Sequence, residues 1–256
     1  MQFDHKKSLL EILGRSQNSR HRVARRIQNQ ESAVAAPTFA FDIHPAPPVA
    51  SSQLREAFRD VVTPHISDNL QRLSGLTGLR RFHRSRKLVG TAYTVKARPG
   101  DNLLIYKALE DMQPGHVLVV DGAGDPTNAL VGELIMLCAI QRGCAGFVLD
   151  GAIRDTAAFF EADFPCYARS VSHRGPYKLG PGAINGPVTV GAQVVQPGDL
   201  VVGDEDGVVS FPPADAERLL AAVRQTQANE DAIKAEIATG RPEQAWLRKV
   251  LSSHGL

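Results

Sequence analysis

The sequence lacks the features that several large protein classes require. Its 256 residues carry a formal net charge of only +2, which argues against the global basic field of a nucleic-acid-binding protein. No apolar run approaches the roughly 18 to 20 residues that a membrane-spanning helix needs. Gly122, Gly124 and Gly132 do not fit the G-x-G-x-x-G dinucleotide fingerprint, and the lysine of a phosphate-binding P-loop is missing. We therefore expect no membrane and no nucleic acid among the partners.

Cysteine is also scarce. The three cysteines, Cys138, Cys144 and Cys166, show no metal-type spacing, and the first two lie in an apolar stretch. This usage predicts reduced core residues in a cytoplasmic protein.

The chain divides into a start of unusual composition and a longer globular part. Residues 1–31 hold seven lysines and arginines against three acids, which fits either a solvated helical arm or an organelle transit peptide. Short helical pieces are expected at residues 8–13 and 23–27. Residues 35–52 are rich in proline, alanine and serine and predict a linker. We therefore expect an N-terminal extension with a Pro-rich linker over residues 1–50 and a compact domain over residues 51–256.

The pattern of apolar residues predicts an α/β fold that continues into β structure and ends in a long helix. Strands are expected at residues 90–97, 117–121 and 147–150, and helices at residues 52–61, 103–112 and 128–141. The helix over residues 128–141 is apolar nearly all round and should be internal. Short strands between residues 187 and 211 predict an antiparallel layer, and a C-terminal helix should run from about residue 212 to 239.

Two turns of the central unit carry residues suited to chemistry. Gly132 and Glu133 stand at the head of the predicted apolar helix, whose first amides could bind a carboxylate or phosphate. Arg154 and Asp155 follow a buried strand, where ligands of α/β sheets bind. Arginine can hold a carboxylate or neutralise an oxyanion, and Asp155 could bind a hard divalent ion with Glu133 acting through water. A simple salt bridge at a strand end is the alternative.

These residues resemble the family of 4-hydroxy-4-methyl-2-oxoglutarate aldolases and regulator of ribonuclease E activity A. The family's signature is an acid, twenty intervening residues and then Arg-Asp, and Glu133 stands at that spacing from Arg154-Asp155. Supporting matches are Gly143-Cys-Ala-Gly146, Asp150-Gly151, Phe164-Pro165, Pro197-Gly198-Asp199 and residues 204–209. The resemblance covers about residues 51–223.

The resemblance implies a fold, an activity and a role for each residue. The fold would be a layered α/β/β sandwich of the swivelling-domain type. The activity would be class II aldol cleavage of 4-hydroxy-2-oxo acids such as 4-hydroxy-4-methyl-2-oxoglutarate to pyruvate, with oxaloacetate decarboxylation alongside. Asp155 would bind Mg²⁺, Mn²⁺ or another divalent metal, and Glu133 would hold its water. Arg154, Gly132 and the amides of Leu134 and Ile135 would bind the 2-oxo acid, with Arg154 and Glu133 in the catalytic set.

The resemblance also implies a homotrimer or hexamer with sites between subunits. The alternative function is that of a non-catalytic, protein-binding oligomer like the ribonuclease regulator. A quinone methyltransferase is disfavoured because no S-adenosylmethionine turn is evident. Residues 117–163 contain no lysine, which disfavours Schiff-base chemistry there, although Lys96 or Lys107 could reach in.

Some other polar residues are weaker candidates. His173 with Arg174 could reach a distal carboxylate of the substrate, or could be ordinary loop residues. His65 and Asp68 could line the cleft, although capping and surface roles are expected. Asp204-Glu205-Asp206 is interpreted as an acidic turn outside the site.

Overall fold

A computed structural model describes residues 41–240 and 244–256. Its helices are α2 (Ser52–Ala57), α3 (Thr63–Asn69), α4 (Leu103–Asp111), α5 (Glu133–Gln141), α6 (Thr156–Ala162), the 3-10 helix η1 (Pro213–Asp215), α7 (Ala216–Ala238) and α8 (Ala245–Ser253). Its strands are β1 (Asp42–Ile43), β2 (Arg80–Arg81), β3 (Leu88–Ala97), β4 (His116–Val131), β5 (Gly146–Ile153), β6 (Cys166–Val171), β7 (Gly182–Ile184), β8 (Val188–Val190), β9 (Gln193–Val195), β10 (Leu200–Gly203) and β11 (Val208–Phe211). The predicted helical pieces at residues 8–13 and 23–27 lie outside the described residues.

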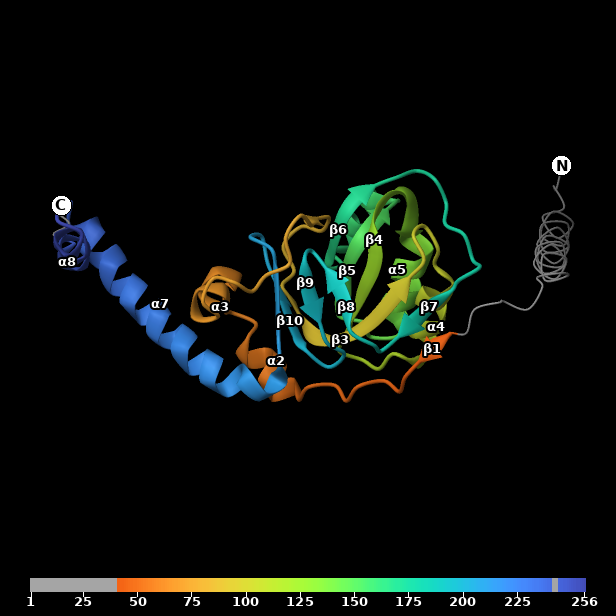
Figure 1. The fold of residues 1–256 in the computed structure, drawn as a ribbon, viewed down its shortest axis with the longest axis horizontal. Coiled ribbons are helices and arrows are strands. Elements are labelled where there is room, and N and C mark those ends of the chain that lie inside the picture. The colour runs from red at the N-terminus through yellow and green to blue at the C-terminus, as the bar shows by residue number, and fades with distance from the viewer. Residues whose placement is uncertain (1–40, 241–243) are drawn as a thin grey trace, which may run out of the picture. The chain divides into compact units, whose positions relative to one another are not determined.

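A central sheet organises the described part of the chain (Figure 1). Within residues 41–240 and 244–256 it has nine strands, in the order β1-β7-β3-β4-β5-β6-β2, with β10 and β11 branching from β3. The neighbours β3, β4, β5 and β6 are parallel, and β10 is antiparallel to β3. Their cores are nearly continuous runs of apolar residues, as expected for strands covered on both faces.

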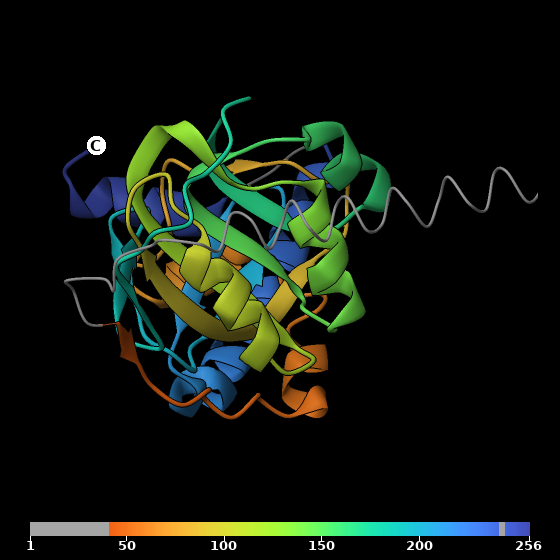
Figure 2. The ribbon, with the colours of Figure 1, turned by 90° about the vertical axis from the view of Figure 1, so that its right-hand side faces the viewer.

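Two layers cover this sheet. One apolar cluster joins strands β3 to β6 to helices α4, α5 and α6, whose ribbons are drawn in Figure 2. Within this cluster Phe147 packs edge to face with Phe159 and with Phe164. The small sheet β8–β9 covers other side chains of the same strands through Val188, Val190 and Val195. Helices α2, α3 and α7 pack with β10 and β11 in a third cluster. The predicted mixed α/β fold with a C-terminal helix is confirmed, and its layers are α/β/β.

The central strand and helix differ from the predicted bounds. Residues 128–131, expected to begin the helix, extend β4, because Ala129 and Val131 pair with Ala152 and Ile153 of β5 across irregular register. Helix α5 therefore begins at Glu133. The prediction that this helix is internal is wrong: Leu134, Leu137 and Ile140 are 70%, 46% and 38% exposed. Cys138 on the same helix is exposed too, so only Cys144 and Cys166 are the core residues predicted.

The compact unit also starts earlier than the sequence predicted, at Phe41. Residues 41–50, expected to be linker, run along the domain: β1 pairs with β7, and Pro47 O accepts a hydrogen bond from His116 Nε2 at 3.0 Å. Backbone pairing at a sheet edge does not need apolar periodicity, so composition alone pointed to a linker. Ser51 caps α2, its side-chain oxygen accepting from Leu54 N–H at 3.1 Å.

Two aspartates anchor the loops around the start of β3. Asp204 is buried and accepts from the Thr63 amide at 2.7 Å, the Thr63 hydroxyl at 2.5 Å and Lys87 Nζ at 3.0 Å. Burial alone would raise the pKa of Asp204, but these donors lower it. Val62 is the N-cap residue of α3, and Asp204 accepts the amide of Thr63, the first residue of that helix. Asp163 accepts the amides of Arg84, Ser85 and Arg86.

Candidate functional site

The candidate site lies where two neighbouring parallel strands end. Val131, the last residue of β4, pairs with Ile153, the last residue of β5, and Arg154 N–H donates to Val131 O at 3.0 Å. Gly132-Glu133 and Arg154-Asp155 therefore leave the sheet side by side. The predicted placement of Arg154 at a strand's carboxyl end is confirmed, because it follows β5 directly.

Asp155 links the two strand ends. Its Oδ2 accepts the amide N–H of Glu133, the first residue of α5, at 3.0 Å, and lies 3.6 Å from Arg154 Nε. Asp155 has φ 56° and ψ 41°, in the left-handed region that residues other than glycine rarely adopt. Asp155 stands at the N-cap of α6, but its carboxylate makes no capping hydrogen bond to that helix. Such backbone conformations persist where surrounding contacts fix them, and they are concentrated at functional sites.

Gly132 leaves the space in which this arrangement forms. Its φ of −152° is open to any residue, so the backbone angle does not require glycine. A Cβ at this position, however, would overlap Asp155 Oδ2 and would lie 2.9 Å from Arg154 Cγ and 3.1 Å from Arg154 Nε. Glycine is therefore needed for the close approach of Arg154 and Asp155 to the start of α5.

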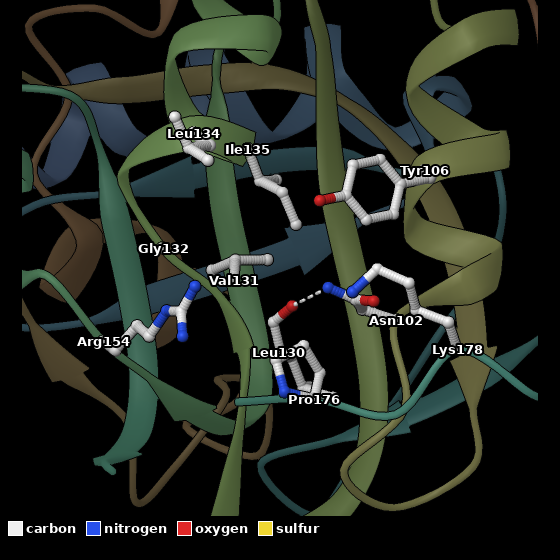
Figure 3. Close-up of a pocket in the computed structure, with 10 residues that line it drawn as sticks. All are labelled: Asn102, Tyr106, Leu130, Val131, Gly132, Leu134, Ile135, Arg154, Pro176 and Lys178. Carbon is white, nitrogen blue, oxygen red and sulfur yellow. Dashed lines mark hydrogen bonds between the residues drawn. The ribbon is translucent and has the colours of Figure 1, made fainter. Parts of the chain in front are cut away.

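A small pocket of about 50 Å³ opens between α4, α5 and the segment that follows β6 (Figure 3). Four of the predicted residues line it: Gly132, Leu134, Ile135 and Arg154. The first α-helical hydrogen bond of α5 runs from Met136 N–H to Gly132 O, so the amides of Leu134 and Ile135 have no acceptor within the helix. Together with Arg154 they can receive a carboxylate.

The far side of the pocket carries polar residues that the sequence did not reveal. Figure 3 places Tyr106, Asn102 and Lys178 across from Arg154. Asn102 is 2% exposed; its Nδ2 donates to Leu130 O at 3.0 Å, and its Oδ1 has no hydrogen-bond partner among the described residues. Lys178 Nζ lies 5.7 Å from the centre of the Tyr106 ring. Lys178 is distant in sequence from both motif turns and belongs to no motif. No sequence pattern therefore indicated that it would line the pocket.

The weaker candidates lie elsewhere or play structural parts. His65 is buried and pairs with Glu230 of α7 at 3.0 Å, so the expected surface role is wrong. His173 and Arg174 do not line the pocket; the Arg174 carbonyl accepts from Ala129 N–H, and the later residues Pro176 and Lys178 of this segment reach the pocket instead. Asp204 is an anchor outside the site, in agreement with the prediction.

The lysines that we considered for Schiff-base chemistry do not reach the pocket. Lys107 pairs with Asp111 at 2.9 Å on the surface of α4, and Lys96 lines a different cavity. Lys178 does line the pocket, but its side chain is exposed to solvent, whereas an imine-forming lysine is normally desolvated.

The carboxylate oxygens of Asp155 and Glu133 are of the type that a hard divalent ion prefers. No group of three or more histidine, cysteine or acidic side chains gathers into a metal cage within residues 41–240 and 244–256. Mg²⁺ commonly uses only one or two protein carboxylates, and keeps several waters. Asp155 uses Oδ2 for the Glu133 amide, while its side chain is 43% exposed and the Glu133 side chain is adjacent and exposed.

The sequence profile of the RraA-like family, described as Aldolase/RraA, matches residues 63–210. The chain belongs to this family. The match includes Gly132, Glu133, Arg154, Asp155 and Lys178. The resemblance inferred from the spacing of Glu133 and Arg154-Asp155 is thereby confirmed.

Relatives of this RraA-like chain carry names of two kinds. A protein of Halalkalibacterium halodurans named "Putative 4-hydroxy-4-methyl-2-oxoglutarate aldolase" is 38% identical over 196 residues, which cover 76% of this chain and 93% of that protein. The RNA-processing inhibitor RraA from Thermus thermophilis is 31% identical, with a TM-score of 0.55 over 60% of this chain and 93% of its own. Streptomyces coelicolor RraAS2, an unusual member of the RNase ES inhibitor RraA family, is 26% identical, with a TM-score of 0.63 over 71% and 96%.

Among the described residues of the RraA-like chain, no helix is both long enough and apolar enough to cross a bilayer.

Proposed function

We propose that this RraA-like protein is a divalent-metal-dependent aldolase that cleaves 4-hydroxy-2-oxo acids to pyruvate and decarboxylates oxaloacetate. The observation that supports this most is that Arg154 and the first turn of α5 line one pocket at the ends of β4 and β5. Asp155 does not line this pocket but lies beside it, where its Oδ2 accepts the Glu133 amide. A 2-oxo acid offers a carboxylate and a neighbouring carbonyl, which suit an arginine and a helix N-terminus.

The pocket suggests how the substrate is oriented. The amides of Leu134 and Ile135 bind the 1-carboxylate, and the Arg154 guanidinium lies beside the 2-oxo oxygen. Lys178 and the Tyr106 hydroxyl, on the other side, receive the distal carboxylate of a dicarboxylic substrate. This arrangement exposes the bond between C3 and C4 to the space between Arg154 and the Asp155–Glu133 pair.

Cleavage needs removal of one proton and stabilisation of one negative charge. A water held by Glu133 accepts the proton of the C4 hydroxyl, the C3–C4 bond breaks, and a new C4 carbonyl leaves with the second product. The electron pair moves to the 2-oxo oxygen, where Arg154 offsets the charge. Protonation at C3 by water then gives pyruvate. A divalent cation bound by Asp155, and through water by Glu133, would supply Lewis acidity at the 2-oxo acid.

We propose a trimeric or hexameric assembly in which a second copy closes the site. The pocket of one chain is small, and Leu134 at its edge is 70% exposed. The outward residues Leu137 and Ile140 of α5 continue this apolar surface, and Phe160 of α6 is 55% exposed. Exposed apolar patches of this kind mark interaction surfaces. The same surface also suits the alternative function, a protein-binding regulator such as the RraA relatives.

Pyruvate release from 4-hydroxy-4-methyl-2-oxoglutarate and from oxaloacetate tests the enzyme, with Mg²⁺ and then with EDTA. Asp155→Ala should abolish turnover. Asp231→Asn, which removes one carboxylate on the distant helix α7, should behave as wild type. Borohydride added with pyruvate should leave the protein mass unchanged, because no imine forms. A pure, metal-loaded oligomer that cleaves neither compound would contradict the aldolase and favour the regulator.

A further inference from the structure

A second polar cavity lies at the amino ends of the central parallel strands, opposite the candidate active site. Its volume is about 390 Å³, within the range of small-molecule sites. Lys87, Gly115 and Ala145 line it, and they stand immediately before β3, β4 and β5. The candidate active site follows the carboxyl ends of β4 and β5, so the two cavities are separated by the length of the parallel strands.

Four cationic side chains line this second cavity: Arg55, Arg59, Arg86 and Lys87. Arg59 pairs with Glu56 at 2.9 Å, and Lys87 pairs with the buried Asp204 at 3.0 Å. Arg55 and Arg86 have no carboxylate within 4.0 Å among the described residues. Within the described part of the chain no acidic residue lines the cavity, so its lining is positive although the whole chain is nearly neutral.

The side chains of Arg55 and Lys87, and the backbone of Arg86, are held in place before any ligand arrives. Arg55 Nε donates to Ala50 O at 3.2 Å, and Lys87 Nζ also donates to Val61 O. The Arg86 backbone is fixed on both sides, because its amide donates to Asp163 at 3.3 Å and its carbonyl accepts a hydrogen bond from His83 Nε2 at 2.9 Å. Fixed donors lose less conformational entropy on binding than free ones.

The floor of the cavity is kept low by two glycine turns. Gly115 and Gly143 have φ of 97° and 73°, which favour glycine, and Gly115 N–H donates to Gly143 O at 2.9 Å. A Cβ on Gly115 would lie 2.5 Å from Arg55 Nη1, so the guanidinium lies directly over this floor. The remaining floor is apolar, with Val89, Pro114 and Cys144, so a ligand there replaces water next to unpaired guanidinium groups.

We propose that this cavity is a binding site for a small molecule that carries phosphate groups. Guanidinium groups bind phosphate oxygens through paired hydrogen bonds, and Arg55 and Arg86 are the two without a carboxylate partner. A cavity of about 390 Å³ with a small apolar floor suits a phosphorylated metabolite better than a polymer, which would need a basic stripe along the surface. The site is independent of the proposed catalytic reaction.

Isothermal titration of the full-length oligomer with pyrophosphate in EDTA tests this proposal. EDTA prevents pyrophosphate from binding through a metal at Asp155. Wild type should bind, and Arg55→Gln and Arg86→Gln should each weaken binding at least tenfold, as expected for the loss of a charge-assisted hydrogen bond. Arg218→Gln removes the same charge from the surface of α7 and should bind as wild type, as should Arg154→Gln in the other pocket. Because only the backbone of Arg86 supports the fold, Arg86→Gln is expected to fold even if Arg55→Gln does not.

Competing ligands identify the chemical class. Succinate, a dicarboxylate, and a short single-stranded RNA are titrated in parallel. The proposal is overturned if wild type does not bind millimolar pyrophosphate, or if Arg218→Gln or Arg154→Gln weakens binding as much as Arg86→Gln. It is also overturned if succinate binds as tightly as pyrophosphate through Arg86, or if RNA binds there and pyrophosphate does not.

Discussion

Replacing Gly132 by alanine should separate catalysis from folding. The backbone at Gly132 is extended, so alanine fits its φ and ψ without strain. The added methyl would lie 2.9 Å from Arg154 Cγ, and ordinary contact begins near 3.4 Å, so Arg154 has to retreat by about 0.5 Å. Asp155 Oδ2 is closer still and must leave its position against the Glu133 amide.

The consequences for activity and stability differ in size. Displacing groups of a catalytic arrangement by about 1 Å can cost about 100-fold in rate, so kcat/KM for pyruvate release should fall by about that factor. The free energy of unfolding should fall by only about 1.5 to 3 kcal/mol, the value of one charge-assisted hydrogen bond. For a domain of this size that corresponds to a Tm decrease of roughly 3 to 12 °C.

The assay couples pyruvate to lactate dehydrogenase, and circular dichroism follows Tm. Gly186→Ala is the matched control, because a Cβ there would meet no atom within 4 Å. It should leave both rate and Tm unchanged. Full activity in Gly132→Ala would refute the reasoning, since Arg154 and Asp155 would then not need their observed positions.

Three further predictions concern other parts of the molecule. The backbone amides of Ser85, Arg86 and Arg84, of which Ser85 has the largest effect, lower the pKa of Asp163 from 3.8 to about 2. The charged carboxylate therefore stabilises the fold above pH 4, and this stabilisation is lost as the pH falls towards 2. Asp163→Asn, which tolerates the left-handed backbone, should therefore have a lower Tm than wild type at pH 7, and the difference should shrink between pH 4 and pH 2; a constant difference would contradict this. Lys178→Met should raise KM for 4-hydroxy-4-methyl-2-oxoglutarate about tenfold with a smaller change in kcat, while deuterium exchange of the pyruvate methyl group, followed by NMR, stays as in wild type. Leu137→Asp should reduce the oligomer to smaller species in light scattering, whereas Lys234→Asp on α7 should not; an unchanged mass for Leu137→Asp would exclude α5 from the interface.

The sequence was sufficient for the features that depend on local pattern. Buried parallel strands, the C-terminal helix and the Ser51 cap follow from periodicity and capping chemistry. The pairing of Glu133 with Arg154-Asp155 was also predictable, because one helix and one strand separate two ends of a parallel pair. Sequence alone could not extend β4 to Val131, since the hydrogen bonds that hold Ala129 and Val131 come from a distant strand.

What escaped prediction depends on tertiary contacts. The roles of Thr63 and His65 are decided by Asp204 and Glu230, which are far away in sequence. Lys178 enters the pocket only because residues 172–178 cross over β4, where the Ser172 hydroxyl donates to Thr127 O. An all-round apolar helix likewise indicates an internal position, yet its exposed face also suits contact with another chain.

The pocket is built from two parts of different origin. Its Arg154 side is fixed by the hydrogen-bond ladder between β4 and β5, whereas Lys178 and Pro176 belong to a connection that leaves β6 and returns to the sheet at β7. Under the proposed function, exchanging residues 173–179 between relatives should change which acid is accepted while leaving Arg154 and Asp155 in place. For protein engineering, this means that the connection between β6 and β7 can be exchanged as a unit while the paired ends of β4 and β5 are kept.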